Sequence, residues 1–212
     1  KTGDFVVVNT CPGAGDCKIY CYAKRGGYVQ WKASSLSQSK LLNFIINDPR
    51  GFKSKMIAEL KAVQNKYAGK DVNIVVRWHD AGDFFSDAYL QLGYDIANAL
   101  PDVDFYAYTK LANVAKGSKP KNFITNFSAG ALPSQQSQVD VAANKHSDVV
   151  KKDVFDDLIE KDAKGKRVLT TDGHYQWKQG AMDELKNRMV KKYNISKDSI
   201  IDYKELMKIA PS

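Results

Sequence analysis

The three cysteines of this 212-residue chain, Cys11, Cys17 and Cys21, lie within eleven residues of one another. Their C-x5-C-x3-C spacing falls in a segment rich in glycine, proline and aspartate, which is typical of a ligand-holding loop and not of three unrelated core thiols. Thiolates on one such loop can bind zinc, close a disulfide or wrap an iron–sulfur cluster. The spacing therefore predicts a chemical role for this segment.

An iron–sulfur cluster explains these cysteines best. A disulfide framework is disfavoured because the number is odd and a chain of this length needs no covalent staple. A zinc site would need a fourth ligand, and the three histidines are distant in sequence and in no finger-like spacing. The sequence thus predicts a [4Fe–4S] cluster on Cys11, Cys17 and Cys21, with one iron open to a substrate, an exogenous ligand or a non-cysteine side chain.

The composition is that of an ordinary globular protein, with 43% hydrophobic and 26% charged residues and a formal net charge of +8. The lysines are spread along the chain and many fall on predicted helix faces. This pattern favours a solvated surface, with nucleic acid as an alternative partner. No apolar run approaches the ~18 residues of a membrane span, and no signal peptide is visible, so we expect no membrane association and a cytoplasmic location.

Short apolar runs alternate with amphipathic stretches along the chain. The runs predict strands, and the amphipathic stretches predict helices that begin at Ser34 or Ser35, near Phe52 and after the capping residue Ser86. The predicted strands are 5–8, 72–78, 103–109, 122–127 and 166–171. Further predicted helices lie near 111–114, near 154–159, at 178–193 and at 200–209.

The alternation of strands and helices predicts right-handed βαβ units and a mostly parallel sheet. The chain is shorter than the ~250 residues of a complete eight-stranded barrel. We therefore expect an α/β fold with a partial, open parallel barrel, and a doubly wound parallel sheet as the alternative. The predicted organisation is a single domain over residues 1–212, with a cluster loop at 10–28 and a C-terminal helical tail at about 178–212.

Polar residues follow several of the predicted strands, where parallel α/β folds bind their ligands. His79 and Asp80 are candidates to ligate iron, to relay protons or to hold their loop together. Lys110 is a candidate to neutralise an anion or to pair with a carboxylate. His174 completes the set of candidate catalytic residues, although its position beside Tyr175 and Trp177 favours a packed aromatic cluster.

Three motifs carry a resemblance to known families: TCPGAG at residues 10–15, CYA at 21–23 and HDAGDFF at 79–85. The cysteine loop resembles the cluster loop of the radical S-adenosylmethionine superfamily, whose usual spacing is C-x3-C-x2-C. The three motifs together are more similar to the phage gene product 88 family, over about the first 130 residues. This resemblance implies an iron–sulfur domain on a core like that of radical S-adenosylmethionine proteins, which is similar to a TIM barrel.

The predicted function is redox or small-molecule chemistry at the open iron of the cluster. As an enzyme, the chain would cleave S-adenosylmethionine or activate another small molecule, and the different cysteine spacing counts against S-adenosylmethionine. As a non-catalytic carrier, it would exchange electrons with a partner protein. A metal-stabilised nucleic-acid binder is a third alternative, and a phage-encoded protein would work in the host cytoplasm.

Overall fold

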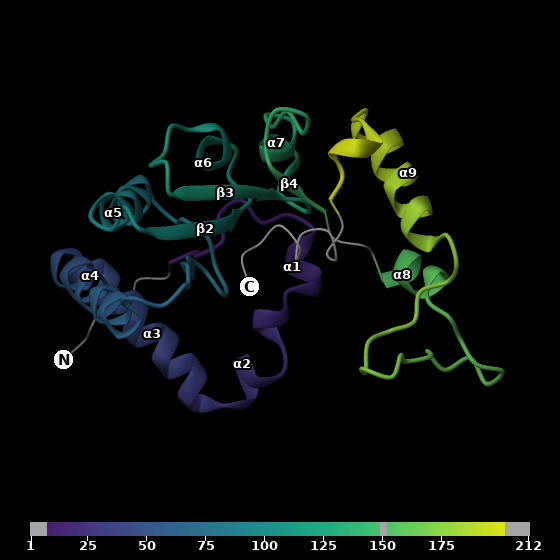
Figure 1. The fold of residues 1–212 in the computed structure, drawn as a ribbon, viewed down its shortest axis with the longest axis horizontal. Coiled ribbons are helices and arrows are strands. Elements are labelled where there is room, and N and C mark those ends of the chain that lie inside the picture. Colours follow the sequence, from purple (N-terminus) through teal and green to yellow (C-terminus); the bar gives the residue numbers. More distant parts are fainter. Residues whose placement is uncertain (1–7, 149–151, 202–212) are drawn as a thin grey trace. The chain divides into compact units, whose positions relative to one another are not determined.

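The computed structural model describes residues 8–148 and 152–201 (Figure 1). Most of the strand predicted at 5–8 and of the helix predicted at 200–209 lies outside the described residues. The chain divides into two compact units, residues 1–140 with 144–147 and residues 141–143 with 148–212. The single domain predicted over residues 1–212 stays a prediction.

The first unit is built on an open parallel sheet of four described strands, in the order β1-β2-β3-β4. The predicted α/β class with a parallel sheet is therefore confirmed. The order follows the sequence, so the change of direction that defines a doubly wound sheet does not occur among these strands. The strands are β1 (Ile74–Arg77), β2 (Val103–Thr109), β3 (Phe123–Ser128) and β4 (His146–Ser147).

Helices connect these strands, because neighbouring parallel strands need a crossover connection. The Ser86 hydroxyl oxygen accepts a hydrogen bond from the Tyr89 N–H at 3.2 Å, which confirms the predicted cap of the following helix. In Figure 1, α6 and α7 lie on the same side of the strands. The three connecting helices are α5 (Asp87–Asn98), α6 (Ala112–Lys116) and α7 (Pro133–Gln136).

Aromatic side chains fill the core of the first unit. Phe84, Phe105 and Phe123 are almost fully buried, and the rings of Phe105 and Phe123 stack on neighbouring strands with centroids 6.0 Å apart. The Trp78 ring packs against all three. Because burying an aromatic side chain is worth several kcal/mol, about 2–3 each, this cluster anchors β1 and the loop that follows it to β2 and β3.

The helices that precede the sheet confirm two sequence predictions with shifted boundaries. The helix predicted to begin at Ser34 or Ser35 starts earlier, after Trp31, and no side chain caps it. The next helix begins at Pro49, where the Asp48 carboxylate accepts a hydrogen bond from the Gly51 N–H at 2.8 Å. The elements here are α1 (Cys17–Tyr20), η1 (Tyr22–Lys24), α2 (Gly27–Gln30), α3 (Lys32–Asn47) and α4 (Pro49–Lys66).

In the second unit, the strand predicted at 166–171 does not join the parallel sheet, so that prediction is wrong. Arg167 and Leu169 instead form antiparallel bridges to Lys161 and Tyr175. Tight turns with Gly165 and Gly173 at positive φ reverse the chain on both sides, whereas a parallel pair needs a crossover of a dozen or more residues. The helices of this unit are α8 (Lys152–Leu158), α9 (Ala181–Tyr193) and η2 (Lys197–Ser199), of which α8 and α9 confirm predicted helices.

Candidate functional site

The cysteine segment, which we define as residues 10–21, runs along the carboxyl edge of the sheet. Beyond the end of β1, the Thr10 carbonyl accepts a hydrogen bond from the Asp83 N–H at 2.7 Å. Beyond the end of β3, the N–H groups of Gly15 and Cys17 both donate to the Gly130 carbonyl, at 3.0 and 3.3 Å. The segment therefore crosses the edge where parallel sheets bind their ligands.

Two glycines of the TCPGAG motif allow this close approach. A Cβ atom at Gly13 would lie 2.4 Å from the Lys110 carbonyl oxygen, and one at Gly15 would lie 2.5 Å from the Ala131 carbonyl oxygen. Real Cβ atoms do not come so near to backbone atoms. The motif is therefore required for the segment to lie against the ends of β2 and β3.

We expect Gly13→Ala to lower the free energy of unfolding by about 1–3 kcal/mol, because the added methyl group must push two backbone segments apart. Chemical denaturation measures this change. The matched control is Gly27→Ala, because Gly27 is exposed in α2 and its Cβ would meet only the movable Trp31 ring, at 3.3 Å. An equal loss in both variants would contradict the close approach at Gly13.

Asp83 joins the ends of β1 and β2 and is only 5% exposed. Its carboxylate accepts three hydrogen bonds, from the Thr109 hydroxyl at 2.9 Å and from the N–H groups of Phe84 and Lys110 at 2.8 and 2.7 Å. Burial raises the pKa of the Asp83 carboxyl, and the hydrogen bonds and the Lys110 charge oppose that rise. Asp83 is thus the residue that chiefly holds the 79–83 loop to the end of β2.

Lys110 joins the ends of β2 and β3. Its ammonium group donates to the Ser128 hydroxyl at 2.8 Å and to the Ala129 carbonyl at 2.9 Å. These acceptors are neutral oxygens, and the charge of Lys110 also acts on the Asp83 carboxyl. Its predicted role toward an anion stays a prediction.

The two candidates that follow β1 have different environments. His79 is largely buried, its Nε2 lies 3.1 Å from the Tyr89 hydroxyl, and burial lowers its pKa to about 4. The imidazole is therefore neutral at pH 7. Asp80 is exposed, its carboxylate accepts a hydrogen bond from the Tyr28 hydroxyl, and its carbonyl accepts one from the Tyr22 hydroxyl.

These two tyrosines were not among the residues predicted for the site. They tie the chain just after Cys21 to the 79–83 loop, to which Thr10 is also bound. The CYA motif includes Tyr22, but no sequence pattern connects it to Asp80, fifty-eight residues away. Only the folded chain identifies this contact.

All three cysteines are half-buried free thiols. Burial raises the pKa of Cys11, the nearby charges of Asp83, Cys21 and Cys17 raise it further, and Lys110 opposes them. Cys11 is therefore protonated at neutral pH. The structure thus brings Cys11, Asp83 and Lys110 together at one edge of the sheet.

The prediction of a [4Fe–4S] protein is wrong. In residues 8–148 and 152–201, no group of three or more His, Cys, Asp or Glu side chains is placed so that it could hold a metal ion. The physical reason is that the segment is attached at two different strand ends, with Cys11 near Asp83 after β1 and Cys17 at Gly130 after β3. A cluster would require the segment to wrap around one point, so the predicted function at an open iron is withdrawn.

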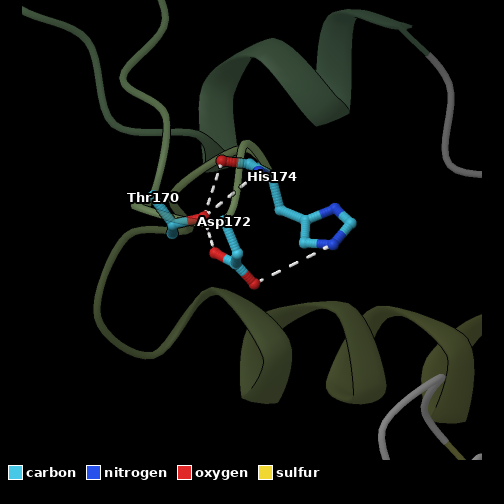
Figure 2. A network of polar contacts seen from close by, with 3 residues as sticks. All are labelled: Thr170, Asp172 and His174. Atoms are coloured by element: carbon cyan, nitrogen blue, oxygen red, sulfur yellow. Dashed lines mark hydrogen bonds and ion pairs between the residues drawn. The ribbon is translucent and has the colours of Figure 1, made fainter.

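His174 lies in the second unit, in the turn shown in Figure 2. The Thr170 N–H donates to the His174 carbonyl at 2.7 Å, the His174 N–H donates to the Thr170 hydroxyl oxygen at 3.1 Å, and the imidazole lies 3.9 Å from the Asp172 carboxylate. The His174 side chain is 81% exposed, so this ion pair contributes little stability. A catalytic role for His174 stays a prediction.

A cavity of ≈ 420 Å³ adjoins the cysteine segment in the first unit. Its walls come from that segment, from the residues after β1, and from those after β2. Cavities of this size at the carboxyl ends of parallel strands commonly hold small molecules. The apolar lining residues are Pro12, Phe84, Phe85, Leu90, Leu111 and Val114.

The fold and the site together define a class of α/β protein with an open parallel sheet. At the carboxyl edge of this sheet lies the cysteine segment, which two glycines allow to approach the backbone closely. The chain belongs to the gene product 88 family, whose family model matches residues 2–192, and the predicted family is thereby confirmed. Comparison with the curated proteins and with the solved structures finds no match. Among the described residues, no helix is both long and apolar enough to cross a membrane.

Proposed function

We propose that this protein binds a small molecule with both apolar and polar groups at the carboxyl edge of its sheet. The observation that carries the proposal is the cavity between Pro12, the residues after β1 and the residues after β2. Its volume lies within the roughly 300–1,000 Å³ of small-molecule sites. Its position follows the rule for parallel α/β sheets, in which the loops after the strands form the ligand site.

The polar residues of the cavity indicate the class of ligand. Ser86, Asp87 and Asn113 complete its lining. The Asp87 carboxylate is the only charged group among the lining residues, and it favours a ligand with a positive charge or a strong hydrogen-bond donor. The apolar walls include two phenylalanines, which favour an aromatic or aliphatic body. The geometry supports an aromatic molecule with a cationic group.

Benzylamine and benzoate are a matched pair of probes, since they have similar size and opposite charge. We expect benzylamine to perturb the NMR signals of the Leu90, Leu111 and Val114 methyl groups, and to bind about two- to five-fold more tightly than benzoate, as a partly exposed charge pair is worth about 0.5–1 kcal/mol. Asp87→Asn should remove that preference. Asp102→Asn, an exposed carboxylate before β2, is the control and should keep it.

Filling the cavity tests the site independently of charge. Leu90→Trp should weaken benzylamine at least about ten-fold, because the larger ring occupies the space that the probe requires. Binding that is unchanged in Leu90→Trp, or a preference for benzoate, would contradict the proposal.

S-Adenosylmethionine, a possible ligand that the cysteine spacing counts against, belongs to this class, since it combines an aromatic base with a sulfonium charge. We propose it as a candidate occupant of the cavity. S-Adenosylhomocysteine lacks the charge and is the matched comparison. Selective binding of S-adenosylmethionine that depends on Asp87 would support this assignment, and equal or absent binding of the two compounds would exclude it. A cytoplasmic location and a nucleic-acid partner stay predictions.

A further inference from the structure

The two ends of the cysteine segment are bound to the same short loop. Thr10, which precedes Cys11, accepts a hydrogen bond from the Asp83 N–H at 2.7 Å. Tyr22, which follows Cys21, donates its hydroxyl to the Asp80 carbonyl. The 79–83 loop therefore brings the first and third cysteines toward each other, although ten positions separate them in sequence.

The electrostatics of the segment agree with this geometry. Cys21 has a larger effect on the Cys11 thiol than Cys17 has. Both Cys21 and Cys11 also act on the Tyr22 hydroxyl. Cys17, by contrast, is bound at the end of β3, where its N–H donates to Gly130. The fold thus attaches the residues beside Cys11 and Cys21 to the 79–83 loop, and Cys17 to the end of β3.

We propose that Cys11 and Cys21 are an exchange-active thiol pair that reacts with low-molecular-weight disulfides and closes into a reversible intramolecular disulfide. This inference is independent of the ligand cavity. It differs from a structural staple, because both cysteines are reduced in the structure and remain half-buried, not sealed in the core.

The reaction is an ordinary thiol–disulfide exchange. One protein thiol gives up its proton to solvent and, as a thiolate, attacks a sulfur of the small disulfide, whose S–S bond breaks, and the first small thiolate leaves and takes up a proton. The second protein thiolate then attacks the protein sulfur of the mixed disulfide and releases the second small thiol. Two protein thiols are oxidised to one disulfide, and one small disulfide is reduced to two thiols.

The segment between the pair can adjust to the bond. A disulfide requires its two Cα atoms to lie within about 7 Å of each other. The intervening α1 has four residues, and no side chain caps it. Little local structure therefore opposes a small movement of Cys21 toward Cys11.

The test is exposure of the reduced full-length protein to oxidised glutathione, followed by alkylation of free thiols and peptide mapping by mass spectrometry. We expect a Cys11–Cys21 cross-linked peptide, with Cys17 alkylated, and its disappearance after treatment with reduced glutathione. Absence of an intramolecular disulfide, or a cross-link that contains Cys17, would overturn the proposal. The mapping uses the unmodified protein, so it does not depend on whether variants fold.

Single substitutions sharpen the assignment. Cys17→Ser is the matched control and should form the intramolecular disulfide within about two-fold of the original yield. Cys11→Ser and Cys21→Ser should each lower that yield at least about ten-fold and accumulate a mixed disulfide with glutathione, since the resolving thiol at high effective concentration is gone. Equal losses in all three variants would count against the pair.

Discussion

Asp83→Ala should lower the free energy of unfolding by about 3–5 kcal/mol, the largest effect expected for a substitution at this site. The substitution leaves the Thr109 hydroxyl and the N–H groups of Phe84 and Lys110 without their acceptor in a buried position. Each such unsatisfied donor costs about 1–3 kcal/mol, and partial entry of water reduces the sum. Chemical denaturation followed by tryptophan fluorescence measures the change.

The exposed Asp104 of β2 provides the control, since Asp104→Asn should change stability by no more than about 0.5 kcal/mol. The loss of stability in the isosteric Asp83→Asn should lie between the losses in these two variants, because an amide keeps one acceptor oxygen and loses the other. A loss at Asp83 no larger than that at Asp104 would show that the carboxylate does not hold the strand ends together.

The pKa of Asp83 also has a consequence for the pH dependence of stability. Its folded-state pKa is raised, so the folded protein keeps this proton at pH values where the unfolded chain has lost it. The stability that this proton binding contributes is therefore fully present below the ordinary aspartate pKa. It is lost as the pH rises through the raised pKa of the folded state. Asp83→Asn removes this contribution.

His79 has the opposite effect on the pH dependence of stability, and it is the basis of the second large prediction. Its folded-state pKa of about 4 lies below the ordinary value of 6.5, so protons prefer the unfolded chain. The stability that neutral His79 provides is complete above pH 6.5 and is lost as the pH falls toward 4. The linkage relation gives a loss of about 2 kcal/mol between pH 7 and pH 5.

Denaturant titrations at pH 7 and pH 5 test this prediction in the original protein and in His79→Gln. The variant should lose about 2 kcal/mol less between the two pH values, whatever its stability at pH 7. His174→Gln is the matched control, because the His174 side chain is 81% exposed. The contribution of Asp83 is common to all three proteins and cancels in the comparison. The same pH dependence in His79→Gln and the original protein would contradict a buried neutral imidazole.

The elements of the sheet could be predicted where their signals are local. The run at 103–109 alternates buried and exposed residues, and the structure has a strand with those bounds. Ser86 lies just before an amphipathic stretch and caps α5 as expected. By contrast, the two-residue strand β4 has no sequence pattern, because it forms only by pairing with the end of β3. The strand predicted at 166–171 has suitable residues, but the turns around it impose antiparallel pairing.

The sequence by itself determined the α/β class, the family, and the position of the cysteine segment beside the ends of the strands. These features depend on periodicity, caps and motifs, which are short-range properties of the chain. Only the tertiary structure decided how the thiols are arranged, that Asp83 joins β1 to β2, and that a cavity adjoins Pro12. These features depend on distances and burial among residues far apart in sequence. The three cysteines suggested a single metal centre, but the hydrogen bonds of their segment attach Thr10 to Asp83 and Cys17 to Gly130, at different strand ends.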